Sequence, residues 1–105
     1  MEHLVRIRIT VYKTFNAKDI FGKDMPKVPA GYQNTCPRLK EGQTFISQDA
    51  GFPEGFCSWA YADIQRDLTM LRFGCNFPGM PNDVVYSCCT DGLRPVIFKS
   101  ERLPD

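Results

Sequence analysis

"SWAYADIQRDLTMLRF", residues 58–73, is the stretch of this chain that decides the fold. Its apolar residues recur at spacings of four, four and three, which puts them on one side of a 3.6-residue helical period: Ala60, Ile64, Leu68 and Leu71. Gly74 follows and favours a left-handed end to a helix. The pattern predicts an amphipathic helix over about 58–73, with Ser58 as its N-cap.

The segments before and after this helix alternate as strands do. Apolar residues on one face predict a strand over about residues 4–13: Val5, Ile7, Ile9 and Val11. Near the C-terminus, "DVVYSCC" and "RPVIFKSE" flank "TDGL", whose Asp-Gly pair predicts the turn of a β-hairpin. We therefore expect a single α+β domain over 1–105, in which one main helix packs on a small, mostly antiparallel sheet.

A long irregular segment, about residues 16–56, lies between the first strand and the helix. Four prolines and five glycines interrupt it, and "GQTFIS" is its one strand-like string. So much irregular chain in a compact domain is typical of a functional loop region, or of elements that the pattern does not reveal.

Composition limits the classes of partner. The chain has 105 residues, 43% hydrophobic and 24% charged, as expected for one ordinary globular domain. Its net charge of +1, without a basic block, argues against nucleic-acid binding. No apolar run approaches the roughly 18 residues that cross a bilayer, so we expect no membrane partner.

The five cysteines are expected to be free thiols, ligands or nucleophiles. Charged residues interrupt any apolar run in "MEHLVRIRITVYKTF", so the N-terminus does not resemble a signal peptide. We therefore expect a cytoplasmic protein, whose thiols are kept reduced. An odd number of cysteines also forbids complete internal pairing.

Cys57 stands at the beginning of the predicted helix. Unpaired N–H groups and the positive end of the helix dipole there stabilise a thiolate, which makes it a better ligand or nucleophile. A free cysteine also often serves as a small apolar packing residue, so both interpretations stay open. Glu54, in the same loop, is the nearest candidate proton carrier, unless it is simply a solvated carboxylate. Trp59 and Phe56 form part of an aromatic cluster that is either core or the wall of a pocket.

The hairpin carries the other candidate residues. Cys88 and Cys89 are consecutive, so on a strand they point to opposite faces, and periodicity does not say which face is inside. Asp91 is first of all a turn former. Arg94 could pair with Asp91 or present its planar guanidinium to an anionic ligand.

A metal centre is a further candidate. Four thiols are enough in number for a Zn or Fe–S site, but no C-x-x-C pair supports one: Cys36, Cys57, Cys88 and Cys89. Cys75 is most simply a packing residue. The one histidine, His3, lies near the N-terminus, which argues against a Cys-His or Ser-His-Asp catalytic pair.

Two cysteine-bearing strings together resemble those of a small uncharacterised family of mainly prokaryotic single-domain proteins. The first is "PEGFC" with Trp59-Ala60, and the second is "CC" followed by "DG", "RPV" and Phe98. The resemblance points to the same four cysteines and implies no activity. This chain departs from the family pattern at three positions, with Ser58 and Thr90 in place of the frequent proline and Cys75 in place of glycine.

The leading hypothesis is a small intracellular protein with a cysteine-lined, aromatic-walled site, which binds a small molecule or a soft metal or performs thiol chemistry. If the protein is an enzyme, Cys57 is the expected nucleophile or acid/base and Arg94 holds an anionic group. The alternative is a non-catalytic assembly module, whose cysteines are packing residues and whose strand edges make a homo-oligomer.

Overall fold

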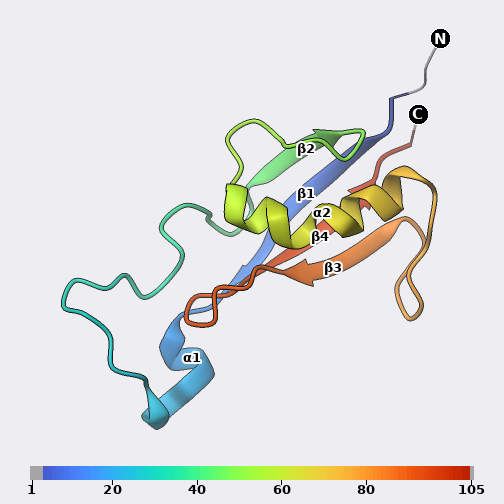
Figure 1. The fold of residues 1–105 in the computed structure, drawn as a ribbon. Helices are drawn as coiled ribbons and strands as arrows, with labels where there is room; N and C mark the ends of the chain where they lie inside the picture. Colours follow the sequence, from blue (N-terminus) through green and yellow to red (C-terminus); the bar gives the residue numbers. More distant parts are fainter. Residues whose placement is uncertain (1–3, 105) are drawn as a thin grey trace.

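The computed structural model describes residues 4–104, so His3 lies outside the described part of the chain. Four strands form one antiparallel sheet in the order β2-β1-β4-β3. The strands are β1 (Arg6–Thr14), β2 (Thr44–Gln48), β3 (Val84–Cys88) and β4 (Val96–Arg102) (Figure 1). Together with its helices, this sheet confirms the predicted α+β class.

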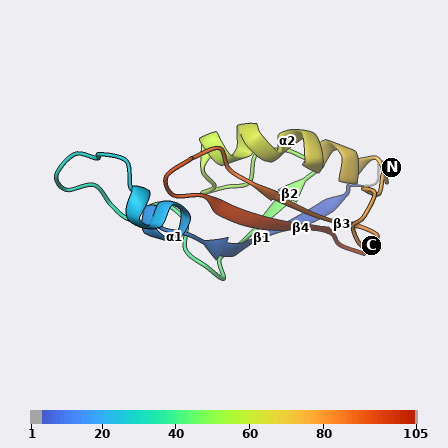
Figure 2. The same ribbon diagram turned by 90° about the horizontal axis from the view of Figure 1, so that it is seen from below.

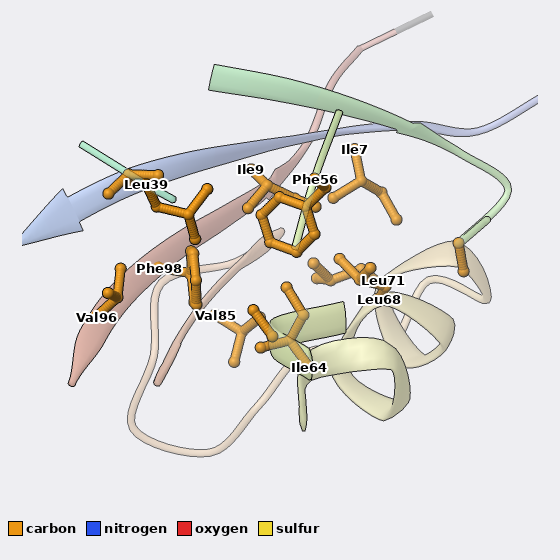
Figure 3. Packing of buried hydrophobic residues seen from close by; sticks show 13 residues of the cluster. Ile7, Ile9, Leu39, Phe56, Ile64, Leu68, Leu71, Val85, Val96 and Phe98 are labelled. Carbon is orange, nitrogen blue, oxygen red and sulfur yellow. The ribbon is translucent and has the colours of Figure 1, made fainter. Parts of the chain in front are cut away.

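The main helix, α2 (Ser58–Arg72), covers one face of the sheet (Figure 2). The core lies between them, and both predicted apolar faces are confirmed because their central residues are completely buried: Ile7, Ile9, Val11, Ile64, Leu68 and Leu71. Phe56, just before α2, packs in the middle of this core (Figure 3). Burial of each large apolar side chain contributes about 1.5–3 kcal/mol, so these contacts hold α2 on the sheet.

The ends of α2 differ in how well the sequence predicted them. Gly74 has φ of 80° and its N–H donates to the Leu71 carbonyl at 3.0 Å, as a left-handed helix end requires. The prediction of Ser58 as N-cap is wrong. The N-cap is Cys57, with φ −78° and ψ 124°, and its side chain makes no capping hydrogen bond. The helix therefore begins one residue earlier than an N-cap at Ser58 would place it.

The predicted irregular segment, 16–56, is too long. It contains a short helix α1 (Ala17–Phe21), a 3-10 turn η1 (Gly22–Asp24) and strand β2, which overlaps the strand-like string. A reciprocal capping box begins α1, since the Asp19 N–H donates to Asn16 Oδ1 at 2.8 Å and the Asn16 N–H donates to Asp19 Oδ2 at 3.1 Å. The helix is only five residues long, too short for an apolar period to reveal it.

The C-terminal hairpin is confirmed, but its turn is not the predicted one. Strands β3 and β4 pair in an antiparallel register from Val84 with Glu101 to Cys88 with Ile97. Residues 89–95 connect them, and Gly92 lacks the positive φ that a two-residue Asp-Gly turn needs. The Asp91 side chain shapes this longer loop instead.

The molecule is elongated, with extents of 54 × 29 × 20 Å. Its radius of gyration is 15.2 Å, compared with about 13 Å for a compact domain of this length. Helix α1 and the loop after η1 project from one end of the sheet and account for this length (Figure 1). Between residues 4 and 104, no helix is long and apolar enough to cross a membrane.

Candidate functional site

A pocket of about 120 Å³ lies at the beginning of α2, where three segments distant in the sequence meet. Its walls come from the loop before β2, from the first residues of α2 with its N-cap, and from the β3–β4 connection with the start of β4: Cys36, Pro37, Arg38 and Leu39; Cys57, Trp59 and Ala60; Cys89, Asp91, Arg94 and Val96. The three segments lie at the same end of the sheet (Figure 1). This volume suits a ligand smaller than a drug-sized molecule, because drug-sized ligands bind in pockets of about 300–1,000 Å³.

Three of the four cysteines predicted to form a site line this pocket. Cys36, Cys57 and Cys89 are half-buried free thiols that also pack against the hydrophobic core. Cys88 is exposed and lies outside the pocket, because the strand turns consecutive side chains to opposite faces. Alternation on β3 thus puts Cys89 on the same side as the buried Val85. Cys75, also free, does not line the pocket.

The predicted four-cysteine metal site requires correction. No group of three or more His, Cys, Asp or Glu within residues 4–104 is arranged to hold a metal ion. Cys88 is separated from the other three by the strand geometry just described. The predicted Zn or Fe–S ligand set is therefore not assembled among residues 4–104.

The Cys89 thiol is held in a fixed, partly desolvated position. Its Sγ accepts a hydrogen bond from the Val96 N–H at 3.3 Å. Burial raises the pKa of the Cys89 thiol, and this effect outweighs the N–H groups that would stabilise the thiolate. Cys89 is therefore a weaker nucleophile near neutral pH than an exposed thiol.

Asp91 and Arg94 form an ion pair on the pocket wall. Nε of Arg94 lies 3.1 Å from Asp91 Oδ2, and Asp91 Oδ1 accepts the N–H groups of Leu93 at 3.0 Å and Arg94 at 3.1 Å. Burial alone would raise the pKa of Asp91, but these N–H donors and the guanidinium outweigh it and lower the pKa. The Arg94 guanidinium carbon also lies 4.8 Å from the centre of the Tyr32 ring, which further orients it.

Trp59, in the first turn of α2, forms an exposed wall of the pocket and links α2 to the β3–β4 connection. Its side chain is 62% exposed, yet its Nε1 donates to Thr90 Oγ1 at 2.7 Å. The Thr90 N–H and hydroxyl in turn donate to the carboxylate of Asp63, at 2.8 and 3.1 Å. This Trp59–Thr90–Asp63 clamp fastens the β3–β4 connection to α2 and so sets the width of the pocket.

Two predicted site residues lie elsewhere. Phe56 is 3% exposed and meets Phe45 and Phe98 edge to face at 5.0 and 5.5 Å, so it belongs to the core and not to the pocket wall (Figure 3). Glu54 is exposed in a turn and is not among the pocket residues. The aromatic wall of the site is therefore Trp59.

The sequence reasoning missed Arg38 and Leu39. Leu39 is 3% exposed and contributes to both the core and the pocket, whereas Arg38 is exposed. Their one signal was proximity to Cys36 in "CPRL", which gives no indication of what the loop packs against.

Comparison of the chain with protein-family models, curated proteins and solved structures gives no match in any of the three. The family resemblance of the two cysteine-bearing strings therefore stays a prediction, and the function is argued from the pocket alone.

Proposed function

We propose that this is a small cytoplasmic protein that binds a small molecule in the pocket at the start of α2 and reacts with it through the Cys57 thiol. One observation carries this proposal: three free cysteines from distant parts of the chain line a single pocket. Cysteines that serve only as small apolar packing residues have no reason to gather at a cavity beside a helix N-terminus.

Cys57 is the preferred nucleophile among the three. It occupies the N-cap of α2, next to the first-turn N–H groups and the positive end of the helix dipole, and it lines the pocket. Cys89 is disfavoured because burial keeps its thiol protonated. Cys36 lines the same pocket from the loop before β2, which makes it a candidate partner thiol.

Peptide mapping of alkylated native protein tests the proposal. The protein is treated briefly with iodoacetamide at pH 7, and mass spectrometry follows the labelling of each cysteine. Exposure alone predicts that Cys88 reacts first, since it is the exposed thiol of the described chain. We expect Cys57 to react faster than both Cys88 and free glutathione.

The single tryptophan provides a matched readout of binding. Trp59 lines the pocket, so alkylation of Cys57 should change its fluorescence, whereas alkylation of Cys88 should not. Cys57→Ser should abolish the change and Cys88→Ser should preserve it. Slower labelling of Cys57 than of Cys88, without a fluorescence response, would instead assign Cys57 to packing.

A second candidate function is assembly of identical copies through the sheet. Within residues 4–104 no helix covers the face opposite α2, which carries Ile46 at 43% and Tyr12 at 55% exposure (Figure 2). Strands β2 and β3 each pair with one neighbour, which leaves two edges for a second copy. Sedimentation should then give a dimer that Ile46→Glu dissociates; a monomer at all concentrations would exclude this candidate.

A further inference from the structure

The charges on the pocket wall indicate which ligands it accepts. Three ionic side chains line the pocket, Arg38, Asp91 and Arg94, so two positive charges and one negative charge leave a surplus of one positive charge. Cys89 adds no negative charge near neutral pH, because its thiol stays protonated. The chain as a whole carries only +1, so this surplus is a local feature and not a property of the whole surface.

Arg94 is held ready for a ligand by its neighbours. Asp91 engages its Nε, and the Tyr32 ring lies against its guanidinium. Among residues 4–104, neither of its terminal nitrogens forms a hydrogen bond or ion pair within the protein. A guanidinium in this state can still offer a planar pair of N–H donors, which matches the two oxygens of a carboxylate.

Arg38 supplies the second positive charge from a different segment, the loop before β2. It is exposed, lies at the pocket, and forms no ion pair with any residue in 4–104. The remaining walls are largely apolar, with Leu39, Trp59 and Val96 among them. Beside apolar walls, the field of two guanidinium groups is screened less than on an open surface.

We propose that the pocket selects small monoanions, with a carboxylate held between Arg38 and Arg94 and an apolar or electrophilic remainder placed against the cysteines. This inference rests on the proposed function and names its ligand class. The uncapped first turn of α2, where Trp59 and Ala60 line the same pocket, adds N–H groups that favour the same sign of charge.

Two alkylating reagents of nearly equal size test this selection. Iodoacetate is an anion and iodoacetamide is neutral. In both reactions sulfur forms a bond to carbon, the carbon–iodine bond breaks, iodide leaves and the thiol proton goes to solvent. The measured quantity is the ratio of the two rate constants at each cysteine, by peptide mapping. We expect the iodoacetate-to-iodoacetamide ratio to be at least about fivefold higher at Cys57 than at Cys88.

Variants that change the charge of the pocket test whether its arginines cause the ratio at Cys57. Arg38→Gln and Arg94→Gln should each lower the ratio at Cys57 toward that at Cys88, because each removes one positive charge from the pocket wall. Arg66→Gln is the matched control, since the Arg66 side chain is 84% exposed and outside the pocket. Arg38 is also exposed, so its variant keeps the test valid if Arg94→Gln does not fold.

The possible results separate this inference from the proposed function. If Cys57 reacts rapidly with iodoacetamide but shows the same ratio as Cys88, anion selection is excluded and the reactive pocket stays. If Cys57 reacts with neither reagent, both proposals fall. A high ratio that persists in both Arg38→Gln and Arg94→Gln also overturns the assignment of anion selection to these two arginines. If the selection is electrostatic, the ratio at Cys57 should decrease between 0.1 and 1 M salt, because the Debye length shortens from about 10 to 3 Å.

Discussion

A single carboxylate, that of Asp91, holds the β3–β4 connection in its shape. It accepts two backbone N–H groups and pairs with Arg94, so one residue fixes the backbone of the connection and the Arg94 side chain at once. Acceptance of the N–H groups two and three residues on is the bonding of an Asx turn, so Asp91 fixes the loop through its turn-forming role. Asp91 thus shapes the pocket by positioning Arg94.

Asp91 should make stability depend on pH. Its folded pKa lies below its ordinary value, so its charge stabilises the fold above that ordinary value, and the contribution is lost as the pH falls through the folded pKa. Asp91→Asn should cost about 1 kcal/mol at pH 7 and much less at pH 2, measured by urea unfolding. Glu54→Gln, at an exposed position outside the pocket, should show no such dependence; an equal cost at both pH values for Asp91→Asn would exclude the charge effect.

Phe56 and Phe52 provide a matched pair of aromatic residues before α2. Phe56 is 3% exposed and Phe52 is 51% exposed, although both are near Cys57 in the sequence. Phe56→Ala should lower the free energy of unfolding by about 3–5 kcal/mol, whereas Phe52→Ala should cost clearly less, as measured by urea unfolding. Comparable losses would contradict the placement of Phe56 in the core and Phe52 at its edge.

At the scale of elements, Cys57 is both the N-cap of α2 and a residue of the pocket wall. Serine, threonine, asparagine and aspartate are the preferred N-cap residues, yet this helix begins at a cysteine without a capping hydrogen bond. The position therefore lacks stabilisation that a hydroxyl would supply. The proposed thiol role would account for this, because a cap that is reactive need not be the most stable one.

Cys57→Ser should consequently stabilise the fold. A capping hydroxyl contributes about 0.5–1 kcal/mol, set against a small loss of apolar contact at this half-buried site. Thermal unfolding should show an increased melting temperature together with loss of the fast alkylation. Cys75→Ser serves as the control away from the helix start. If Cys57→Ser lowers stability by more than about 1 kcal/mol, packing is the main role of Cys57.

The whole molecule consists of a packed body and a projecting arm, residues 16–43. Helix α1 makes contacts chiefly with η1, and the loop that follows is mostly exposed. The arm nevertheless returns to the body at Cys36 and Leu39, where it supplies one wall of the pocket. The proposed ligand binding would therefore be connected to the position of the arm through this wall.

Limited trypsin digestion should cut the arm before the body. Lys23 and Lys27 are exposed and outside the sheet, whereas Arg8 and Arg102 lie in paired strands. Mass spectrometry should detect the arm fragments first. Alkylation of Cys57 by iodoacetate should slow cleavage after Arg38 but not after Lys23. Early cleavage within β1 or α2 would contradict this division of the molecule.

Much of the site could not be predicted, because its residues are far apart in the sequence and the fold alone brings them together. Cys57 could be located at a helix start, and Cys88 and Cys89 could be assigned to opposite faces, since both statements depend on local geometry. That Cys89 and not Cys88 faces the pocket depends on which side of the sheet α2 covers. Arg38 had no local signal, because an exposed arginine in a loop looks the same wherever the loop packs.

The sequence by itself determined the amphipathic helix, the first strand and the C-terminal hairpin, because burial on one face leaves a period of 3.6 or 2 along the chain. Only the tertiary structure decided the longer β3–β4 connection, the place of Phe56 in the core and the meeting of Cys36, Cys57 and Cys89. These depend on contacts between residues far apart in the sequence, and no local period records such contacts.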